Sequence, residues 1–223
     1  MKSHTLRDRA ELYNQSRFGQ AYPESRLRAS DRWLQGQWVM GNNYRSKSGM
    51  YGSYPPEYMD RVEAIFPDVR ATLHLFSGSL AGTLTVGSGR RVTLDLRRTA
   101  EVHPDVQGSA EAIPFVPASF DICYADPPYT AADAEKYGTV MIDRRKVLYE
   151  VHRVVVPGGF LVWLDTTLPM YRRDYWKWVG AIAMWRSTNH RVRGVHIFER
   201  VPHAGEVIGY DEDTRPLFDA EGP

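Results

Sequence analysis

The chain has 223 residues, with 28 basic and 27 acidic side chains and a formal net charge of +1. This length fits one α/β domain with a modest appendage, and the near-neutral charge excludes a protein that binds nucleic acid over its whole surface. Apolar residues make up 43% of the chain and charged residues 25%, which is typical of a soluble globular protein.

The sequence carries no targeting signal that we can identify. No apolar run approaches the roughly 20 residues of a membrane span, and the first residues lack the apolar core of a secretory signal. Cys123 is the only cysteine, so no disulfide can form within the chain. We therefore expect a cytoplasmic protein without membrane contact, and the sequence leaves its oligomeric state open.

Residues 1–54 are expected to form an N-terminal extension or flap. They are rich in polar residues and show no sustained periodicity, but Trp33 and Trp38 indicate that part of the extension packs on the main body. At the other end of the chain, residues 204–223 are predicted to be a flexible acidic tail. The main domain is then expected to span residues 55–203.

Within this domain the pattern alternates between strands and helices, which predicts a mostly parallel sheet covered on both faces. Helices are predicted at 57–66 and 143–154, and strands at 72–76, 91–94, 106–107, 120–125 and 160–164. Two apolar runs, 178–185 and 192–200, flank a polar stretch and predict an antiparallel hairpin at the sheet edge.

Three features follow successive predicted strands, at the edge where open α/β sheets bind ligands. The first is the turn Phe76-Ser77-Gly78-Ser79, whose small residues allow a ligand to approach the backbone closely. The second is Asp95, a carboxylate placed to accept hydrogen bonds from the hydroxyls of a ribose. Taken singly, the turn is also compatible with an ordinary loop, and Asp95 with a partner for Arg97 or Arg98.

The third feature is the run Asp126-Pro127-Pro128-Tyr129, which follows an apolar strand. Two prolines make the turn rigid, so the Asp126 side chain and the Pro127 carbonyl offer two fixed acceptors. A planar amino group fits between them while the Tyr129 ring lies against the attached ring. This arrangement suits the exocyclic amine of a nucleobase.

These motifs, together with the segment 108–115 and Pro157-Gly158-Gly159, resemble class I S-adenosylmethionine-dependent methyltransferases. The Asp126 to Tyr129 run resembles the branch that methylates nucleobase amines, such as adenine-specific DNA methyltransferases. The resemblance implies a Rossmann-like fold with a mostly parallel seven-stranded sheet and S-adenosylmethionine as cofactor. Residues 55–201 carry it.

The resemblance also implies residue roles. Phe76, Ser77, Gly78 and Ser79 would hold the methionine portion of the cofactor, Asp95 its ribose, and Ser109 and Ala110 would flank its adenine. Asp126, Pro127, Pro128 and Tyr129 would hold the target amine as catalytic residues, with Asp126 also next to the cofactor. Two positions depart from the family: Leu80 replaces a glycine, and Ser109 replaces an acidic residue.

A basic and aromatic stretch at 170–203 offers a surface for nucleic acid, with seven basic against two acidic residues. Packing of the aromatics and solvation of the arginines explain the same pattern. A second contact, or a flap over the cofactor, is expected from Tyr44, Arg45 and Lys47. His190, His196 and His203 lack the partners of a metal site, so no metal is predicted, and Cys123 is expected to be a buried thiol.

We therefore expect methyl transfer to an exocyclic nucleobase amine, with adenine in DNA as the first choice. Methylation of adenine or guanine in structured RNA is the second choice, because no separate recognition domain is visible. A noncatalytic nucleic-acid-binding protein with the same fold is the third, since Leu80 and Ser109 depart from the cofactor motifs. DNA or RNA is the expected partner in each case.

Overall fold

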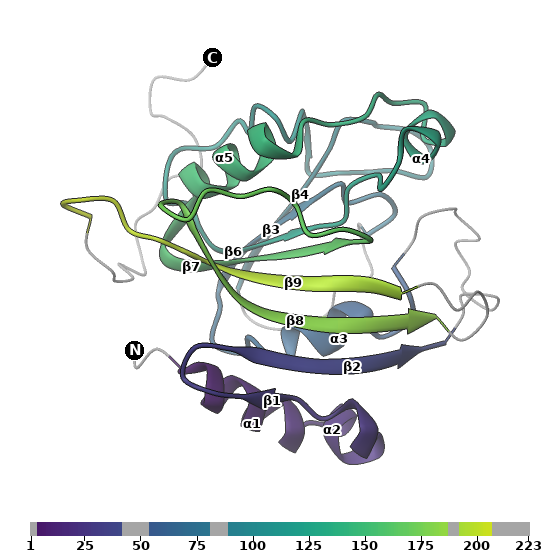
Figure 1. The fold of residues 1–223 in the computed structure, drawn as a ribbon. Helices are drawn as coiled ribbons and strands as arrows, with labels where there is room; N and C mark the ends of the chain where they lie inside the picture. Colours follow the sequence, from purple (N-terminus) through teal and green to yellow (C-terminus); the bar gives the residue numbers. More distant parts are fainter. Residues whose placement is uncertain (1–3, 42–53, 81–88, 187–191, 207–223) are drawn as a thin grey trace.

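The computed structural model of the chain describes residues 4–41, 54–80, 89–186 and 192–206. Nine strands form one sheet in the order β1-β2-β8-β9-β7-β6-β3-β4-β5 (Figure 1). They are β1 (Arg28–Ala29), β2 (Leu34–Met40), β3 (Ala71–Leu75), β4 (Arg90–Asp95), β5 (Val106–Gln107), β6 (Phe120–Ala125), β7 (Val155–Asp165), β8 (Trp176–Arg186) and β9 (Val192–Arg200).

The pairing within this sheet confirms the expected α/β fold of the Rossmann-like methyltransferase type. Strands β3 to β7 pair in parallel, β8 and β9 form an antiparallel hairpin, and β9 also runs antiparallel to β7. The strand predicted at 160–164 is longer in the structure, because β7 begins at Val155, directly where the preceding helix ends. The other predicted strands are found within two residues of their expected ends.

Seven strands were expected and nine are present, because the N-terminal extension adds two. β2 pairs in parallel with β8, so the hairpin is not the edge of the sheet, and β1 pairs antiparallel with β2. The inward residues Leu34, Trp38 and Met40 are buried and alternate with exposed ones. This alternation is short and is interrupted by Gly36, which explains why the sequence pattern did not reveal the strand.

The extension also contains two helices that the sequence pattern did not predict, α1 (Leu6–Gln15) and α2 (Arg17–Ala21), followed by a short 3-10 turn at Pro23–Ser25. The buried stripe of α1 includes a charged residue, Arg9, which hides the apolar period. Its guanidinium donates to Asp68 at 2.7 and 3.0 Å and lies 4.8 Å from the rings of Phe66 and Phe160. A paired and stacked arginine can therefore occupy a core position.

Helices cover both faces of the sheet (Figure 1). On one face, α1, α2 and α3 (Tyr58–Glu63) pack on a core that includes Tyr13, Trp38 and Ile182. On the other, α5 (Arg144–Val154) packs on a core that includes Cys123 and Trp163. The short helix α4 (Ala131–Lys136) follows β6. Residues at alternate positions of β6 and β7 enter the two cores, which is why these central strands are apolar throughout.

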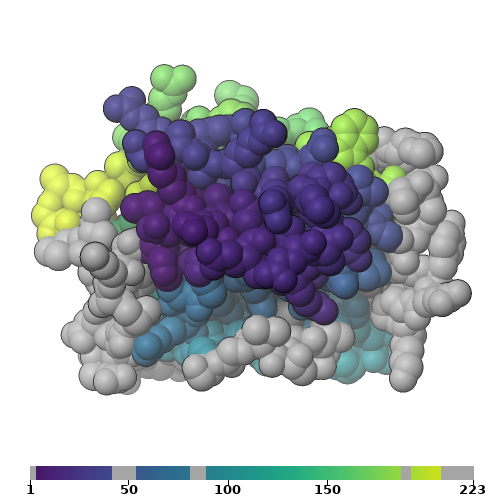
Figure 2. All heavy atoms as spheres, turned by 90° about the horizontal axis from the view of Figure 1, so that it is seen from below, coloured from purple at the N-terminus to yellow at the C-terminus, as the bar shows by residue number. Residues whose placement is uncertain are grey.

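The space-filling view in Figure 2 shows the N-terminal segment, in purple, spread over the middle of one side of the molecule. Trp33 contacts Trp178 edge-on at 4.8 Å, and Trp38 is fully buried between the rings of Tyr13 and Tyr58. The expectation that the two tryptophans anchor the extension is thus confirmed. Tyr44, Arg45 and Lys47, and most of the predicted tail, lie outside the described residues.

Candidate active site

An open cavity lies at the carboxyl ends of β3, β4 and β6. The sheet topology brings these three ends together, although the sequence separates them. Nearly all the residues predicted to bind a cofactor or a target line this cavity: Phe76, Ser77, Gly78, Ser79, Asp95, Ser109, Ala110, Asp126 and Pro128. The three strand-end motifs therefore form a single site.

The turn after β3 has an unusual backbone. Both Phe76 and Gly78 have positive φ angles, of 57° and 53°. Glycine adopts this conformation freely, whereas phenylalanine is strained in it, and such strain is typical of functional turns. The Ser77 hydroxyl is buried at the cavity wall and has no hydrogen-bond partner among the described residues. An unpartnered buried hydroxyl at this position is available to a ligand.

Asp95 is 7% exposed and connects this turn to β4. Its carboxylate accepts a hydrogen bond from the Gly78 N–H at 2.9 Å and another from the Arg97 N–H at 2.9 Å. Each carboxylate oxygen has a second lone pair, so Asp95 can still accept from two hydroxyls in the cavity. The contact with Arg97 that the sequence left open is present, and Asp95 lines the cavity as well.

Ser109 and Ala110 form the next part of the wall. The Ser109 hydroxyl accepts from the Glu111 N–H at 3.1 Å, so it stabilises its own turn. The Glu111 carboxylate in turn accepts from the Asp143 N–H at 2.7 Å, just before α5 begins. Ala110 is buried and offers an apolar surface. This part of the cavity suits a flat ring more than a charged group.

The Asp126 carboxyl lines the cavity at the start of the rigid proline turn. Tyr129 donates to its Oδ1 atom at 2.6 Å, so the two side chains form one unit. The pKa of Asp126 is raised to about 7: burial raises it most and the nearby Asp165 carboxylate adds to the rise, while the Tyr129 hydroxyl and the Arg193 guanidinium lower it. Asp126 and Pro128 line the cavity, whereas the buried Pro127 and the half-buried Tyr129 are not part of its lining.

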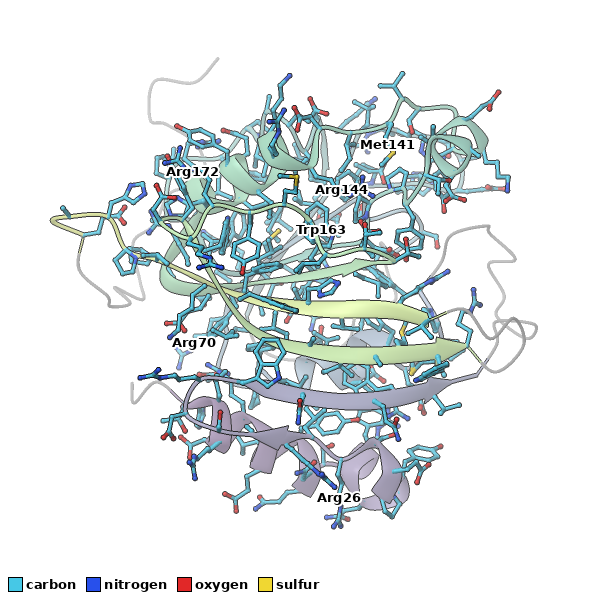
Figure 3. The ribbon with its side chains drawn as sticks, viewed as in Figure 1. Arg26, Arg70, Met141, Arg144, Trp163 and Arg172 are labelled. Atoms are coloured by element: carbon cyan, nitrogen blue, oxygen red, sulfur yellow. The ribbon has the colours of Figure 1, made fainter. Side chains whose placement is uncertain are left out.

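Arg144 and Asp165 hold this turn in place. Asp165 is fully buried at the end of β7 and accepts from Arg144 at 2.9 Å, and Arg144 also donates to the Tyr129 carbonyl at 3.1 Å. In Figure 3, Arg144 is labelled between the ribbon of α5 and that of β7, close to Trp163, whose indole also donates to Asp165. Arg144 therefore links the turn at Tyr129 to the buried Asp165 carboxylate at the end of β7.

Sequence reasoning missed several residues of the site. Tyr54 lines the cavity and stacks on Tyr58 at 4.9 Å, and burial together with the Asp126 charge raises the pKa of both phenols. Tyr137 lines the cavity from the segment after α4, and its carbonyl accepts from Arg97 at 3.1 Å. These residues carry no motif, because only the folded chain brings them to the strand ends.

The basic side chains of residues 170–203 do not form one surface. Arg172 and Lys177 pair with neighbouring carboxylates, and Arg200 is buried and donates to the His152 carbonyl at 2.7 Å. These three lie near the ends of β8 and β9 away from the cavity, and Figure 3 shows Arg172 there. Strands of this length separate their ends by roughly 30 Å. Among the basic residues of this stretch that the structure describes, Arg193 is the one that contacts the site, with its guanidinium over the Tyr129 ring.

The aromatic residues of the same stretch mostly support the packing interpretation. Trp176 is buried and its indole donates to the Leu148 carbonyl at 3.1 Å, while Trp178 contacts Trp33. Trp185 is the exception, with 42% of its surface exposed. Arg191 lies outside the described residues, as does His190.

The part of the chain that the structure describes contains no group of three or more potential metal ligands. Nor does it contain a helix with the length and apolar character needed to cross a bilayer. Cys123 is fully buried in the core beneath α5, as expected, and burial raises the pKa of its thiol.

No protein-family model matches the sequence, and a search of curated proteins finds no relative. Solved structures resemble it only distantly. TrmN from Thermus thermophilus is 17% identical with a TM-score of 0.49, over 69% of this chain and 51% of that one, so this chain spans about half the length of TrmN. The Burkholderia thailandensis 1,6-didemethyltoxoflavin-N1-methyltransferase, solved with S-adenosylhomocysteine, is 11% identical with a TM-score of 0.46, over 63% and 76%.

The putative methyltransferase yhhF from Escherichia coli is 14% identical with a TM-score of 0.42, over 65% of this chain and 86% of that one. At these values the likeness concerns the fold and not the reaction. The fold assignment therefore rests on the sheet topology, and the chemistry has to be argued from the residues of the site.

Proposed function

We propose that this protein transfers a methyl group from S-adenosylmethionine to the exocyclic amine of a nucleobase, with adenine N6 in DNA as the first candidate. The observation that carries the proposal is that the Ser77 and Gly78 turn lines the same cavity as Asp126 and Pro128, and that Asp126 accepts a hydrogen bond from Tyr129. A donor pocket beside a fixed pair of amine acceptors is what such a reaction requires.

The residues of the cavity fit the cofactor. The lining combines the backbone of the Ser77 and Gly78 turn, the Asp95 carboxylate and the apolar Ala110, which are the kinds of group that the three parts of the cofactor need. The unpartnered Ser77 hydroxyl and the backbone of the Gly78 turn would hold the methionine portion, and Asp95 the ribose hydroxyls. Ala110 and the backbone of Ser109 would contact the adenine ring. S-adenosylmethionine supplies an already activated methyl group when bound.

Leu80, which departs from the glycine of the family, lines the cavity and is 9% exposed. It presents an apolar side chain and is part of the core under α3. Ser109 keeps its hydroxyl on the Glu111 N–H, so an acidic contact to the cofactor amine is absent at this position. We infer that the adenine end of the cofactor is held by shape and backbone contacts more than by charge.

The protein itself has little chemistry to perform. Ionised Asp126 and the Pro127 carbonyl would accept the two hydrogens of the target amine and so direct its lone pair towards the methyl group. The Tyr129 hydroxyl fixes the carboxylate, and its ring offers a surface for the target ring. Asp126 needs no strong basicity, because the amine proton becomes acidic only after the methyl group is attached.

A base that reaches this cavity has to leave a duplex. Unstacking costs a few kcal/mol in double-stranded DNA and less in single strands or loops, so unpaired substrates should react faster. RNA stays the second candidate for the same reason. The partner class, DNA before RNA, is part of this proposal.

Two measurements test it. Calorimetry with S-adenosylhomocysteine should give a binding signal, and its absence would favour the noncatalytic alternative. Tritiated cofactor is then supplied with duplex DNA, single-stranded DNA and total RNA. We expect label in DNA with the wild-type protein and none with Asp126→Ala, while the variant still binds S-adenosylhomocysteine. Undiminished transfer by the variant would refute the role of Asp126.

A further inference from the structure

Arg193 is a cation beside the Asp126 to Tyr129 unit that the proposed reaction does not use. It is the second residue of β9, which begins at the edge where β6 and β7 end, and its neighbour Gly194 pairs with Asp165. The guanidinium carbon lies over the Tyr129 ring, 4.9 Å from its centroid. The ring keeps the guanidinium beside the Asp126 to Tyr129 unit.

Arg193 is half-buried, yet it makes no hydrogen bond and no ion pair with any residue of the described ranges. Other half-buried arginines of the site have partners: Arg144 donates to Asp165, and Arg97 donates to the Tyr137 carbonyl. None of the Arg193 nitrogens is among the buried unpartnered atoms, so its donors remain accessible to solvent.

The charges that face Arg193 do not neutralise it at close range. Asp126 interacts with it electrostatically but lies beyond ion-pair distance, and Asp165 is already paired with Arg144. The phenols of Tyr58 and Tyr129 face it as neutral groups, since burial raises the pKa of each. A guanidinium with free donors at a concave site is well suited to a phosphate, which it can bind through two parallel hydrogen bonds.

We propose that Arg193 binds the phosphate attached to the nucleoside whose base enters the Asp126 cavity, so the substrate is a nucleotide and not a free base or neutral heterocycle. This inference rests on the proposed function and narrows its substrate class. The phosphate can belong to a strand or to a mononucleotide, and the experiment below separates the two.

The first test measures binding without turnover. A fluorescein-labelled single-stranded DNA 12-mer with one adenine is titrated by fluorescence anisotropy at several salt concentrations, in the presence of S-adenosylhomocysteine. For Arg193→Gln we expect an affinity about tenfold lower and a salt slope smaller by about 0.7, the contribution of one phosphate contact in a single strand. Arg193→Lys should recover part of the affinity but not the two-point contact.

Arg173→Gln is the matched control. Arg173 is exposed, has no described partner, and lies in the segment between β7 and β8, away from the cavity. The control should bind the 12-mer as the wild type does. Equal affinity and equal salt slope for Arg193→Gln and the wild type would overturn the inference, and so would an equal loss in the control or a wild type that does not bind the 12-mer.

The second test separates phosphate binding from an effect on Asp126. Because Arg193 lowers the pKa of Asp126, methyl transfer is measured well above pH 7, where Asp126 is ionised in the wild type and in the variant, with deoxyadenosine, deoxyadenosine monophosphate and the 12-mer. Arg193→Gln should raise KM for the two phosphate-bearing substrates about tenfold, leave kcat within about twofold, and leave deoxyadenosine unaffected. An equally lower kcat for all three substrates at this pH, with KM for the phosphate-bearing substrates unchanged, would overturn the inference, because Arg193 would then act through Asp126 and not on the phosphate.

Comparison of the two phosphate-bearing substrates identifies the source of the phosphate. A larger effect on the 12-mer indicates a strand, and an equal effect indicates that a single nucleotide is sufficient. A wild-type protein that binds the 12-mer through Arg193 but methylates nothing contradicts the proposed function and leaves this inference standing. Transfer that is insensitive to Arg193→Gln contradicts this inference alone.

Discussion

The hydroxyl of Tyr129 controls the charge of Asp126, and its removal should change the pH at which the protein works. Tyr129→Phe keeps the ring but deletes the group that donates to Asp126 Oδ1 at 2.6 Å. This hydrogen bond lowers the pKa of Asp126, while burial raises it to about 7. Without the hydroxyl, the carboxyl should therefore lose its proton at a higher pH.

The size of the change follows from the bond. A hydrogen bond to a charged group is worth about 1.5–3 kcal/mol, and 1.36 kcal/mol corresponds to one pKa unit, so we expect an upward shift of about one to two units. The ionised form of Asp126 is the one that accepts the amine hydrogens. The rate should rise with pH through about 7 in the wild type, and at a correspondingly higher pH in the variant.

The assay is the pH dependence of kcat for labelled methyl transfer, with S-adenosylhomocysteine affinity measured alongside. Tyr149→Phe is the control, because Tyr149 lies on α5 and is 58% exposed. An unchanged midpoint in Tyr129→Phe, or a midpoint that moves to lower pH, would refute the reasoning.

Three further predictions concern stability and cofactor binding. The pKa of Asp126 is raised from 3.8 to about 7 in the folded state, so its cost to stability is absent below about pH 3.8, grows between about pH 3.8 and 7, and is complete above about pH 7. Asp126→Asn should accordingly have a melting temperature several degrees above that of the wild type at alkaline pH, and the same melting temperature as the wild type at acid pH. A difference in melting temperature that is the same at both pH values would contradict this. Asp95→Ala should weaken S-adenosylhomocysteine at least tenfold by calorimetry, because it removes both a ribose acceptor and the acceptor of the Gly78 N–H; unaltered affinity would exclude this role. Trp38→Ala should lower the free energy of unfolding in urea by about 3–5 kcal/mol, because the side chain is fully buried between two rings; a change below about 1 kcal/mol would mean that the extension is not part of the folded unit.

The local features of the site could be predicted from the sequence. A strand that ends in small residues, a carboxylate after the next strand and a rigid acidic turn after another are each visible within a few positions. Parallel strands place their carboxyl ends at one edge, which is why Gly78, Asp95 and Asp126 line one cavity.

The features that depend on contacts distant in sequence could not be predicted. Arg9 occupies a core position because Asp68 and two rings compensate its charge, and no local pattern signals that partnership. Arg193 reaches the site because β9 inserts between β7 and β8. Composition alone grouped it with Arg172 and Arg200, which have structural partners at the other ends of the strands.

The central claim is that Asp126 presents an exocyclic amine to a methyl donor in the adjacent cavity. The most direct measurement is mass spectrometry of the nucleosides released from DNA after reaction with cofactor that carries a deuterated methyl group. The account predicts the label on an exocyclic base nitrogen with the wild-type protein, and its loss with Asp126→Ala. Label on a ring nitrogen, a carbon atom or the sugar-phosphate backbone would contradict it.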